Sequence, residues 1–330
     1  MRVGRIVIGI DGGGTKTIAA AADMEGNVLA FSRGDGINYN QIGLEKARQN
    51  LKEALAALFA RCDGEIARIV IGCPALDQTA DEETVLSFCA GFLDPAKVTM
   101  ESDVYTAALG LNPGGPCMMV ICGTGSMIVT LDKAGRQKTA GGWGHILGDF
   151  GSGYLLSVQG LQCAIRQWEG FGAETVLASR AMEFFHFSNP RELIDRVYDS
   201  SCDQARLARF AKEVLIAARE GDDAANNILK SNMRSLAGQA RHLLSSAPEV
   251  DLIGLYGGVF QHSALARDTF QAELKRLFPD RSFRFIPPAL PPELGAMVPY
   301  YRQNGLWNEQ TLHNLQTSYA AIRKTEDRAL

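Results

Sequence analysis

The stretch that decides the fold is GIDGGGTKT, from Gly9 to Thr17. The run RIVIGID that contains its start is typical of a buried strand, and TKTIAAAAD indicates a second strand. Glycines between two strands predict a hairpin whose backbone N–H groups can approach a phosphate, because no Cβ atom stands in the way. The alternative is an ordinary tight turn in which the glycines supply only positive φ angles.

Two common phosphate-binding loops do not fit this stretch. A P-loop places Lys-Ser/Thr directly after its last glycine and opens into a helix. Here Lys16 follows Thr15, and the next segment is strand-like. The dinucleotide fingerprint G-x-G-x-x-G before a helix is also absent. A glycine hairpin with hydroxyl donors at Thr15 and Thr17 remains.

Outward from the hairpin, the pattern predicts an α/β protein. The first three strands form an antiparallel meander, and NPGGP at 112–116 is the strongest boundary signal. The expected strands are 5–11, 15–23, 28–34, 68–76, 97–102, 117–122, 126–131, 251–259 and 282–287. The expected helices are 42–60, 81–92, one from Tyr105, a helical region from Gly153 to Ser246, one from Gln261, one from Pro292, and a peripheral tail after Trp307.

The second half repeats the first. A constant shift of 109 positions places Gly14-Thr15-x-Thr17 on Gly123-Thr124-x-Ser126. The same shift places Asp23 on Asp132 and Gly26 on Gly135. Three elements in one register indicate a duplicated three-stranded unit and hence two related domains. Two glycine hairpins facing each other would hold both ends of a triphosphate.

Composition narrows the class of protein. The 330 residues suit two domains, and the formal net charge of −4 argues against a nucleic-acid or membrane surface. The seven cysteines form no CxxC pair, which favours reduced thiols in a cytoplasmic protein over disulfides or a metal cluster. No apolar stretch reaches membrane-spanning length.

Four segments together resemble a known superfamily. IGIDGGGTKT, ICGTGS and LYGGV resemble the two phosphate motifs and the adenosine motif of the actin/Hsp70/sugar-kinase superfamily. GGWGHILGDFGSGYLL resembles the signature of N-acetylglucosamine kinases and the related BadF/BadG/BcrA/BcrD ATPases. The resemblance extends from Gly9 to about Pro299. It implies two ribonuclease-H-like domains, 1–114 and 115–330, with a helical insertion at about 154–246 and with ATP and sugar in the cleft between them.

The resemblance also implies roles for the nucleotide-binding and catalytic residues. Asp103 matches the base that accepts the proton of the attacking sugar hydroxyl, although an Asp before a helix is also a common N-cap. Asp11 would reach Mg²⁺ through water, or would only form a turn. Gly257 and Gly258 would bind adenosine. The ATP phosphates would contact Gly12, Gly13, Gly14, Thr15, Lys16, Gly123, Thr124, Gly125 and Ser126.

A second set would bind the sugar. Asn38 matches a ligand of the sugar hydroxyls, although an Asn in such a loop is often a turn residue. Asp149 would accept hydrogen bonds from sugar hydroxyls. Trp143 could lie against the sugar ring or pack in the core, and His145 is expected to make a structural hydrogen bond. The sugar set is Asn38, Asp103, Gly142, Trp143, Gly144 and Asp149.

Two positions depart from the family pattern. Phe150 stands where relatives often carry Glu, and GCPALD at 72–77 replaces a stretch of small residues, with Pro74 stiffening it. Both bear on which sugar is bound. Phe150 could pack on an acetyl methyl but could not pair with an amine, which favours the N-acetylated sugar.

The sequence therefore predicts a homodimeric, cytoplasmic kinase that uses ATP and Mg²⁺. N-acetylglucosamine, giving the 6-phosphate, is the first expected substrate and glucosamine the second. One alternative is an ATPase activator of a 2-hydroxyacyl-CoA dehydratase, which would hold an iron–sulfur cluster on cysteines. The other is a sugar-sensing regulator without catalysis, which would have no use for the base Asp103.

Overall fold

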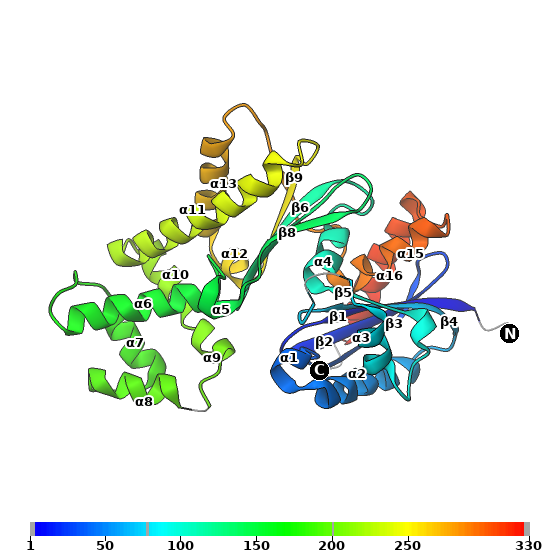
Figure 1. Cartoon of the computed structure of the whole chain (residues 1–330), viewed down its shortest axis with the longest axis horizontal. Coiled ribbons are helices and arrows are strands. Elements are labelled where there is room, and N and C mark those ends of the chain that lie inside the picture. The colour runs from blue at the N-terminus through cyan, green and yellow to red at the C-terminus, as the bar shows by residue number, and fades with distance from the viewer. Residues whose placement is uncertain (1–3, 77–78, 200, 327–330) are drawn as a thin grey trace. The chain divides into compact units, whose positions relative to one another are not determined.

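The computed structural model describes residues 4–76, 79–199 and 201–326, which form two compact units (Figure 1). The first unit contains the chain up to Cys117, Leu131–Gln137 and the segment from Ile286 onward. The second contains Met118–Thr130 and Lys138–Phe285. The boundary expected at 114/115 places residues 286–330 in the second domain, whereas the described residues 286–326 belong to the first unit. No helix in the described ranges is long and apolar enough to cross a membrane.

The first unit contains the strands β1 (Arg5–Gly12), β2 (Lys16–Asp23), β3 (Val28–Asp35), β4 (Glu65–Cys73) and β5 (Val98–Ser102). They form one sheet in the order β3-β2-β1-β4-β5. The pairs β1/β2 and β2/β3 are antiparallel, which confirms the predicted meander, and β1/β4 and β4/β5 are parallel. The carboxyl ends of β1, β4 and β5 therefore meet at one edge of the sheet.

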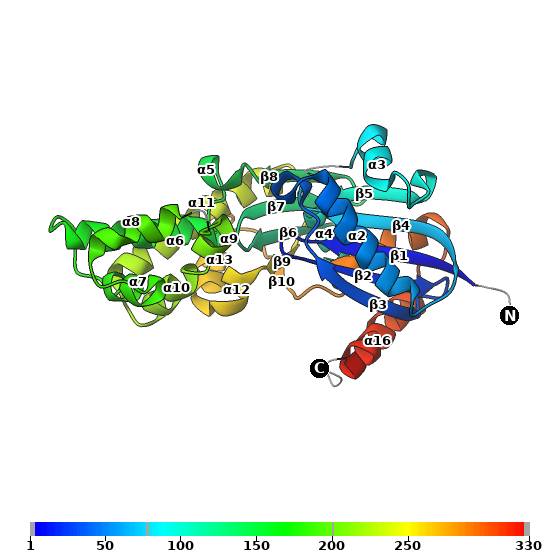
Figure 2. The ribbon, with the colours of Figure 1, turned by 90° about the horizontal axis from the view of Figure 1, so that it is seen from below.

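Helices cover both faces of this sheet. Alternate residues of β1 point to opposite faces, so Ile8 packs in a cluster with α2 and α3, whereas Val7 packs in a cluster with the C-terminal helices. Figure 2 shows α16 beside β3. The tail is helical as predicted, but it is not peripheral, because Leu315 is fully buried. The helices are α1 (Tyr39–Ile42), α2 (Leu44–Phe59), α3 (Glu82–Cys89), α4 (Asp103–Leu111), α14 (Pro292–Gly295), α15 (Val298–Gln303) and α16 (Glu309–Glu326).

The second sheet repeats the strand order of the first. It contains β6 (Cys117–Cys122), β7 (Ser126–Leu131), β8 (Gln137–Gly141), β9 (Leu252–Tyr256) and β10 (Arg284–Phe285), in the order β10-β9-β6-β7-β8. Read from β8, this order matches the first sheet strand for strand. The pairs β6/β9 and β9/β10 are parallel, as are their counterparts. The predicted α/β class with a duplicated unit is confirmed.

The turn after the second strand of each repeat has the same hydrogen bonds. Asp23 and Asp132 each accept two backbone N–H groups, two and four residues later, at 2.8–3.0 Å. Gly26 and Gly135 both adopt positive φ angles, +86° and +78°, which glycine tolerates because it lacks a Cβ atom. The matches seen in the sequence are therefore matches of backbone geometry.

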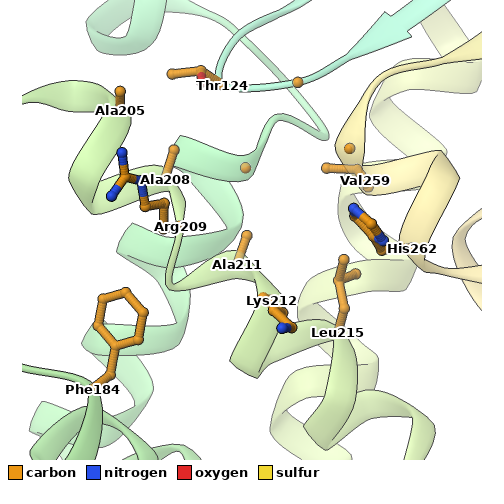
Figure 3. Close-up of a pocket in the computed structure, with 13 residues that line it drawn as sticks. Thr124, Phe184, Ala205, Ala208, Arg209, Ala211, Lys212, Leu215, Val259 and His262 are labelled. Carbon is orange, nitrogen blue, oxygen red and sulfur yellow. The ribbon is translucent and has the colours of Figure 1, made fainter. Parts of the chain in front are cut away.

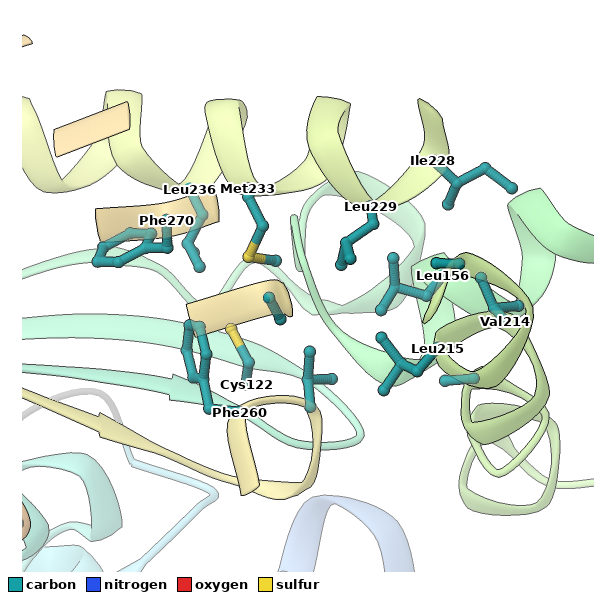
Figure 4. Packing of buried hydrophobic residues seen from close by; sticks show 14 of the residues in the cluster. Cys122, Leu156, Val214, Leu215, Ile228, Leu229, Met233, Leu236, Phe260 and Phe270 are labelled. Carbon is teal, nitrogen blue, oxygen red and sulfur yellow. The ribbon is translucent and has the colours of Figure 1, made fainter. Parts of the chain in front are cut away.

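Helices build most of the second unit around one hydrophobic core. Figure 4 shows Met233 and Leu236 of α11 among Phe260, Phe270 and Cys122, which come from α12, α13 and β6. The apolar faces of α6 and α10 contribute Leu156 and Val214 to the same core. The helices are α5 (Gly144–Leu147), α6 (Gly153–Trp168), α7 (Leu177–Phe185), α8 (Leu193–Tyr198), α9 (Gln204–Ala208), α10 (Ala211–Arg219), α11 (Asp223–Ser245), α12 (Gly258–His262) and α13 (Ala264–Leu277).

Two predicted boundaries are wrong, and both lie at the site. The strand expected through residue 259 ends at Tyr256, and α12 already begins at Gly258. The helix expected from Tyr105 begins at Asp103. In both cases the next helix starts directly at the carboxyl end of a strand. The residues at this junction therefore lie at the edge of the sheet.

We expect Leu315→Ala to lower the free energy of unfolding by about 2–5 kcal/mol, because it removes buried methyl groups and leaves a cavity. Leu86→Ala on α3 is the matched control, since Leu86 is 47% exposed. Chemical denaturation of both variants measures the difference. Equal, small effects of the two substitutions would contradict the packing of α16 on the first sheet.

Candidate active site

The glycines of the first hairpin are required by close packing. Gly13 donates its N–H to Lys16 O at 2.7 Å. A Cβ on Gly12 would lie 2.7 Å from Gly72 O, and one on Gly13 would lie 2.9 Å from Lys16 O. Neither residue, nor Gly14, has a positive φ angle, so the tight-turn interpretation based on φ is wrong for this hairpin. Gly14, Thr15 and Lys16 are exposed at its tip.

The two threonines of this hairpin differ in role. Thr17 is fully buried, and its hydroxyl donates to Asp35 O at 2.7 Å. The expectation that Thr17 offers a hydroxyl donor to a ligand is therefore wrong, because that donor holds β2 to β3. Thr15 is exposed and keeps the role that the sequence assigns to it as a prediction.

Asp103 is the first residue of α4, but it does not cap that helix. The N-cap is Ser102, whose hydroxyl accepts the N–H of Tyr105 at 3.2 Å. The interpretation of Asp103 as the N-cap is therefore wrong. Burial and, second, the nearby charge of Asp11 together raise the pKa of Asp103 to about 7, although hydrogen bonds from backbone N–H groups oppose the shift. A carboxyl with a pKa near neutrality suits proton transfer.

Asp11 lies near the end of β1, where it couples to Asp103 electrostatically. Burial raises the pKa of Asp11, and the positive charge of Lys16 lowers it. Neighbouring carboxylates at a sheet edge make a negative potential that suits a divalent cation. No three side chains of His, Cys, Asp or Glu in the described ranges form a complete metal site. Asp11 and Asp103 could thus supply only part of a coordination shell.

Glu293 is a third carboxyl of this region, and the sequence did not single it out. It lies in the first turn of α14 as a fully buried residue and accepts a hydrogen bond from the Tyr319 hydroxyl. The pKa of Glu293 is raised to about 7, mainly by burial and also by the charge of Asp11, while the hydrogen bond from Tyr319 opposes the shift. Its segment, PPELG, has the pattern of an ordinary helix start, so only tertiary packing reveals its proximity to Asp11.

Asn38 caps α1 and is nearly buried. Its Oδ1 accepts the N–H of Asn40 at 3.2 Å, which agrees with the turn interpretation. Any contact with a ligand would therefore come from its Nδ2 group. The segment 72–76 lies beside this loop, because Asn40 Nδ2 donates to Ala75 O at 3.4 Å. Asp77, the last residue of the GCPALD segment that departs from the family pattern, is outside the described residues.

The second hairpin is held by the helix that follows the GGWGH block. Gly153 donates its N–H to Gly123 O at 2.8 Å, and Tyr154 donates to Thr124 O at 3.2 Å. The Ser126 hydroxyl donates to Phe150 O at 2.7 Å. Its hydroxyl therefore fixes the backbone of the block, and a contact of Ser126 with phosphate would have to use other atoms. The structure thus brings the second hairpin and the GGWGH block together.

Asp149 occupies the space that Gly125 leaves free. A Cβ on Gly125 would lie 2.9 Å from a carboxylate oxygen of Asp149. Asp149 is 4% exposed and has a φ of +57°, an uncommon conformation for a residue with a side chain. Burial raises its pKa, while the backbone N–H of Ser126 and the charge of His145 lower it. A strained, buried carboxylate of this kind is typical of a functional site.

The other residues of the block are accessible. Trp143 is 73% exposed, so the core-packing alternative for it is wrong. Gly142 and Gly144 adopt positive φ angles beside it. His145 contacts the ring of Tyr154 edge-on, with centroids 4.8 Å apart. The sequence predicted a structural hydrogen bond for His145, and the structure shows this ring contact instead.

A cavity of about 520 Å³ opens at the second hairpin (Figure 3). Gly123 and Thr124 line it together with Gly258. Residues of the second phosphate motif and of the adenosine motif therefore line the same cavity. An added Cβ would meet no atom within 4 Å at Gly123 and only the His262 ring, at 4.0 Å, at Gly258. Gly257 has a φ of +96° and lies against Cys122 O. The rest of the lining is Gly153, Phe184, Ala205, Ala208, Arg209, Ala211, Lys212, Leu215, Val259 and His262.

Sequence reasoning missed the cations of this cavity. Arg209 and Lys212 come from the helical region and His262 comes from α12. In helical segments, no residue spacing marks these side chains as ligand contacts.

The cysteines support the prediction of free thiols, since all seven are unpaired in the described residues. Cys117 and Cys122 are buried in β6, and burial raises the pKa of both. They are poorly placed to hold an iron–sulfur cluster.

The fold and these motifs define an ATPase-superfamily protein with two related α/β units. A sequence profile described as the BadF/BadG/BcrA/BcrD ATPase family matches residues 8–298. The chain belongs to this family, which confirms the resemblance found in the sequence.

Characterised relatives of this chain are sugar kinases by name. The chain is 27% identical over 281 residues to an N-acetylmuramic acid/N-acetylglucosamine kinase of Clostridium acetobutylicum, covering 83% of this chain and 92% of the relative. It is 27% identical over 237 residues to an N-acetyl-D-glucosamine kinase of Dictyostelium discoideum, covering 68% and 74%. A solved structure from Chromobacterium violaceum, described as a candidate N-acetylglucosamine kinase, has a TM-score of 0.73 at 26% identity and covers 89% and 98%.

Ionised Asp103 is expected to destabilise the folded protein. Its folded-state pKa of about 7 lies above the ordinary value of 3.8, so its contribution to stability falls as pH rises from about 4 to 7. Asp103→Asn removes this effect. The stability advantage of the variant over wild type should grow by up to a few kcal/mol between pH 5 and pH 8. Denaturant unfolding at both pH values measures it, and a difference independent of pH would contradict the raised pKa.

Proposed function

We propose that this protein is an ATP-dependent kinase that phosphorylates an amino sugar, with N-acetylglucosamine as the first substrate and its 6-phosphate as the product. The names of the relatives and membership of the ATPase family support the reaction class. The observation that carries the mechanism is Asp103, a carboxyl with a pKa of about 7 whose capping role is taken by Ser102.

In the proposed mechanism, Asp103 accepts the proton of the attacking sugar hydroxyl. Phosphoryl transfer depends mainly on positioning and on stabilising charge, so one base is enough on the protein side. The hairpin tip at Gly14, Thr15 and Lys16 would bind phosphate oxygens, and Gly12 and Gly13 would shape it. In the second unit, Gly123, Thr124 and Gly125 would bind phosphate, and Gly257 and Gly258 would bind adenosine.

Magnesium fits the residues of the first unit as a partial site. Asp11 would hold it through water, and the rest of its coordination would come from ATP and solvent. When bound, the ion would neutralise the charge of the transferring phosphates. The mutual repulsion of Asp11 and Asp103 supports this assignment, since a cation would relieve it.

The sugar-binding role rests on the block around Asp149. The buried carboxylate of Asp149 would accept hydrogen bonds from sugar hydroxyls, and the exposed face of Trp143 would lie against the ring. Gly142 and Gly144 would shape this pocket, and Asn38 would donate through Nδ2. Phe150 is 39% exposed, and its apolar ring favours an acetyl group over a free amine. The dimer and the cytoplasmic location remain predictions from the sequence.

The alternatives are less well supported. A dehydratase activator needs an iron–sulfur cluster, and the described residues offer no group of cysteines to hold one. Iron and sulfide assays on anaerobically purified protein test this directly. A regulator without catalysis would not need a carboxyl such as Asp103 with a pKa near neutrality.

Purified protein with ATP and Mg²⁺ should release ADP in the presence of amino sugars, with a higher kcat/KM for N-acetylglucosamine than for glucosamine. Asp103→Asn should bind both substrates while its kcat falls by about 10² to 10⁴. The kcat/KM of the wild type should fall as pH decreases below about 7, because Asp103 becomes protonated. No ADP release above the ATP-only background across a broad sugar panel would refute the kinase assignment.

Gly123→Ala should raise the KM for ATP and leave the KM for the sugar and the melting temperature unchanged. The added methyl would project into the cavity without meeting any protein atom. Gly238→Ala on α11 is the matched control, because its Cβ also meets nothing and it is outside the cavity. It should leave both KM values unchanged. A parallel loss of sugar affinity and stability in Gly123→Ala would instead indicate a distorted hairpin.

A further inference from the structure

A second cavity in the second unit shares lining residues with the cavity at Gly123 and Thr124, which we call the nucleotide cavity. It has a volume of about 590 Å³ and lies between α10 and the start of α13. The two cavities share Lys212, Leu215 and His262. A ligand could therefore extend from the hairpin at Gly123 and Thr124 into this second space. We call the second space the basic groove.

Among the described residues, the side chains that line the basic groove include three cations and no carboxylate. The cations are Lys212, Arg219 and Arg267, and the His262 ring lies among them. Glu213 of α10 and Glu220, the residue after it, are engaged elsewhere, since Arg180 binds Glu213 at 2.6 Å and Glu220 at 2.7 Å. Within the described part of the chain, Lys212 and Arg219 take part in no ion pair. Uncompensated positive charges in a concave site attract anions.

Two features fix the geometry of the groove. The Arg267 guanidinium donates a hydrogen bond to Phe260 O, which orients that side chain at the end of α12. Ser263 and Ala264 line the groove at the N-terminal end of α13. The dipole of this 14-residue helix adds to the positive potential. The side chains and the helix thus favour the same sign of charge.

Adenosine alone does not account for this arrangement. The base and ribose of ATP are neutral, and the negative charge of ATP lies in its phosphates. Arg209 and Lys212 line the nucleotide cavity. Lys212, Arg219 and Arg267 line the basic groove. Cations spread over both cavities instead match a ligand with negative charge along its length. Arginine and lysine bind phosphate oxygens through charge-assisted hydrogen bonds.

We propose that the basic groove binds linear inorganic polyphosphate, with the chain entering the nucleotide cavity and competing there with ATP. The proposal goes beyond the amino-sugar kinase activity and does not require it. The same chemistry could come from a nucleotide with an additional phosphate, so the experiment includes adenosine 3′,5′-bisphosphate as a separate arm.

The experiment measures binding by calorimetry at fixed ionic strength without divalent cations, on the whole chain. The probes are linear inorganic polyphosphate, ATP and adenosine 3′,5′-bisphosphate. Arg219→Gln removes a cation of the groove that does not line the nucleotide cavity. Arg241→Gln on α11 is the control, because it changes the net charge equally at an exposed position outside both cavities.

We expect polyphosphate to bind to the wild type and to be displaced by ATP. Arg219→Gln should weaken polyphosphate binding roughly tenfold, the effect of losing one charge-assisted contact, and leave ATP binding unchanged. Arg241→Gln should change neither affinity, and Lys212→Gln should weaken both.

Three results would overturn the proposal. They are no polyphosphate binding, equal effects of Arg219→Gln and Arg241→Gln, and sensitivity to Arg219 seen only with the bisphosphate nucleotide. Sugar phosphorylation by ATP is assayed on the same variants. Arg219-dependent polyphosphate binding without any sugar phosphorylation would refute the kinase assignment and leave the groove proposal standing.

Discussion

The proposed active site depends on the repulsion between two carboxylates that the first sheet brings together. Asp11 near the end of β1 and Asp103 after β5 are held at the same sheet edge, and each is partly removed from water. Burial disfavours the ionised form of both, and their mutual repulsion adds to the shift for Asp103. Glu293 also interacts electrostatically with Asp11 and so extends the cluster. This arrangement lowers stability at neutral pH, and it is maintained by the packing of α14 and α16 on the sheet.

In the second unit, the absence of side chains at glycines shapes the site. Gly123 and Gly258 leave the backbone of the cavity open, whereas Gly125 gives room to Asp149 and Gly257 allows α12 to start against Cys122 O. Each of these four positions therefore has its own steric reason to be a glycine. The hydroxyl of Ser126 and the N–H of Gly153 then tie the hairpin to the block that contains Asp149. A conformational change in the hairpin should therefore alter the block that contains Asp149, because these hydrogen bonds link the phosphate hairpin to the proposed sugar pocket.

The sequence predicted the features that depend on local pattern. The glycine hairpins, the duplicated turn at Asp23 and Asp132, and the carboxyl at Asp103 all follow from short motifs at fixed spacing. It placed the possible N-cap at Asp103, one residue after the actual cap Ser102, because both residue types cap helices. It also missed Glu293, Arg209 and His262, whose placement depends on contacts between distant segments. The C-terminal tail was assigned to the wrong surroundings for the same reason, since its partner strands lie near the other end of the chain.

The most direct test of this account is a titration of the aspartate carboxyl carbons by NMR, with the resonance of Asp103 identified by its loss in Asp103→Asn. The account predicts that this resonance titrates at about pH 7. It also predicts that the midpoint moves down in Asp11→Asn, because the neighbouring negative charge is removed. An Asp103 resonance that titrates near the ordinary value of 3.8, or one that ignores the Asp11 substitution, would contradict the account.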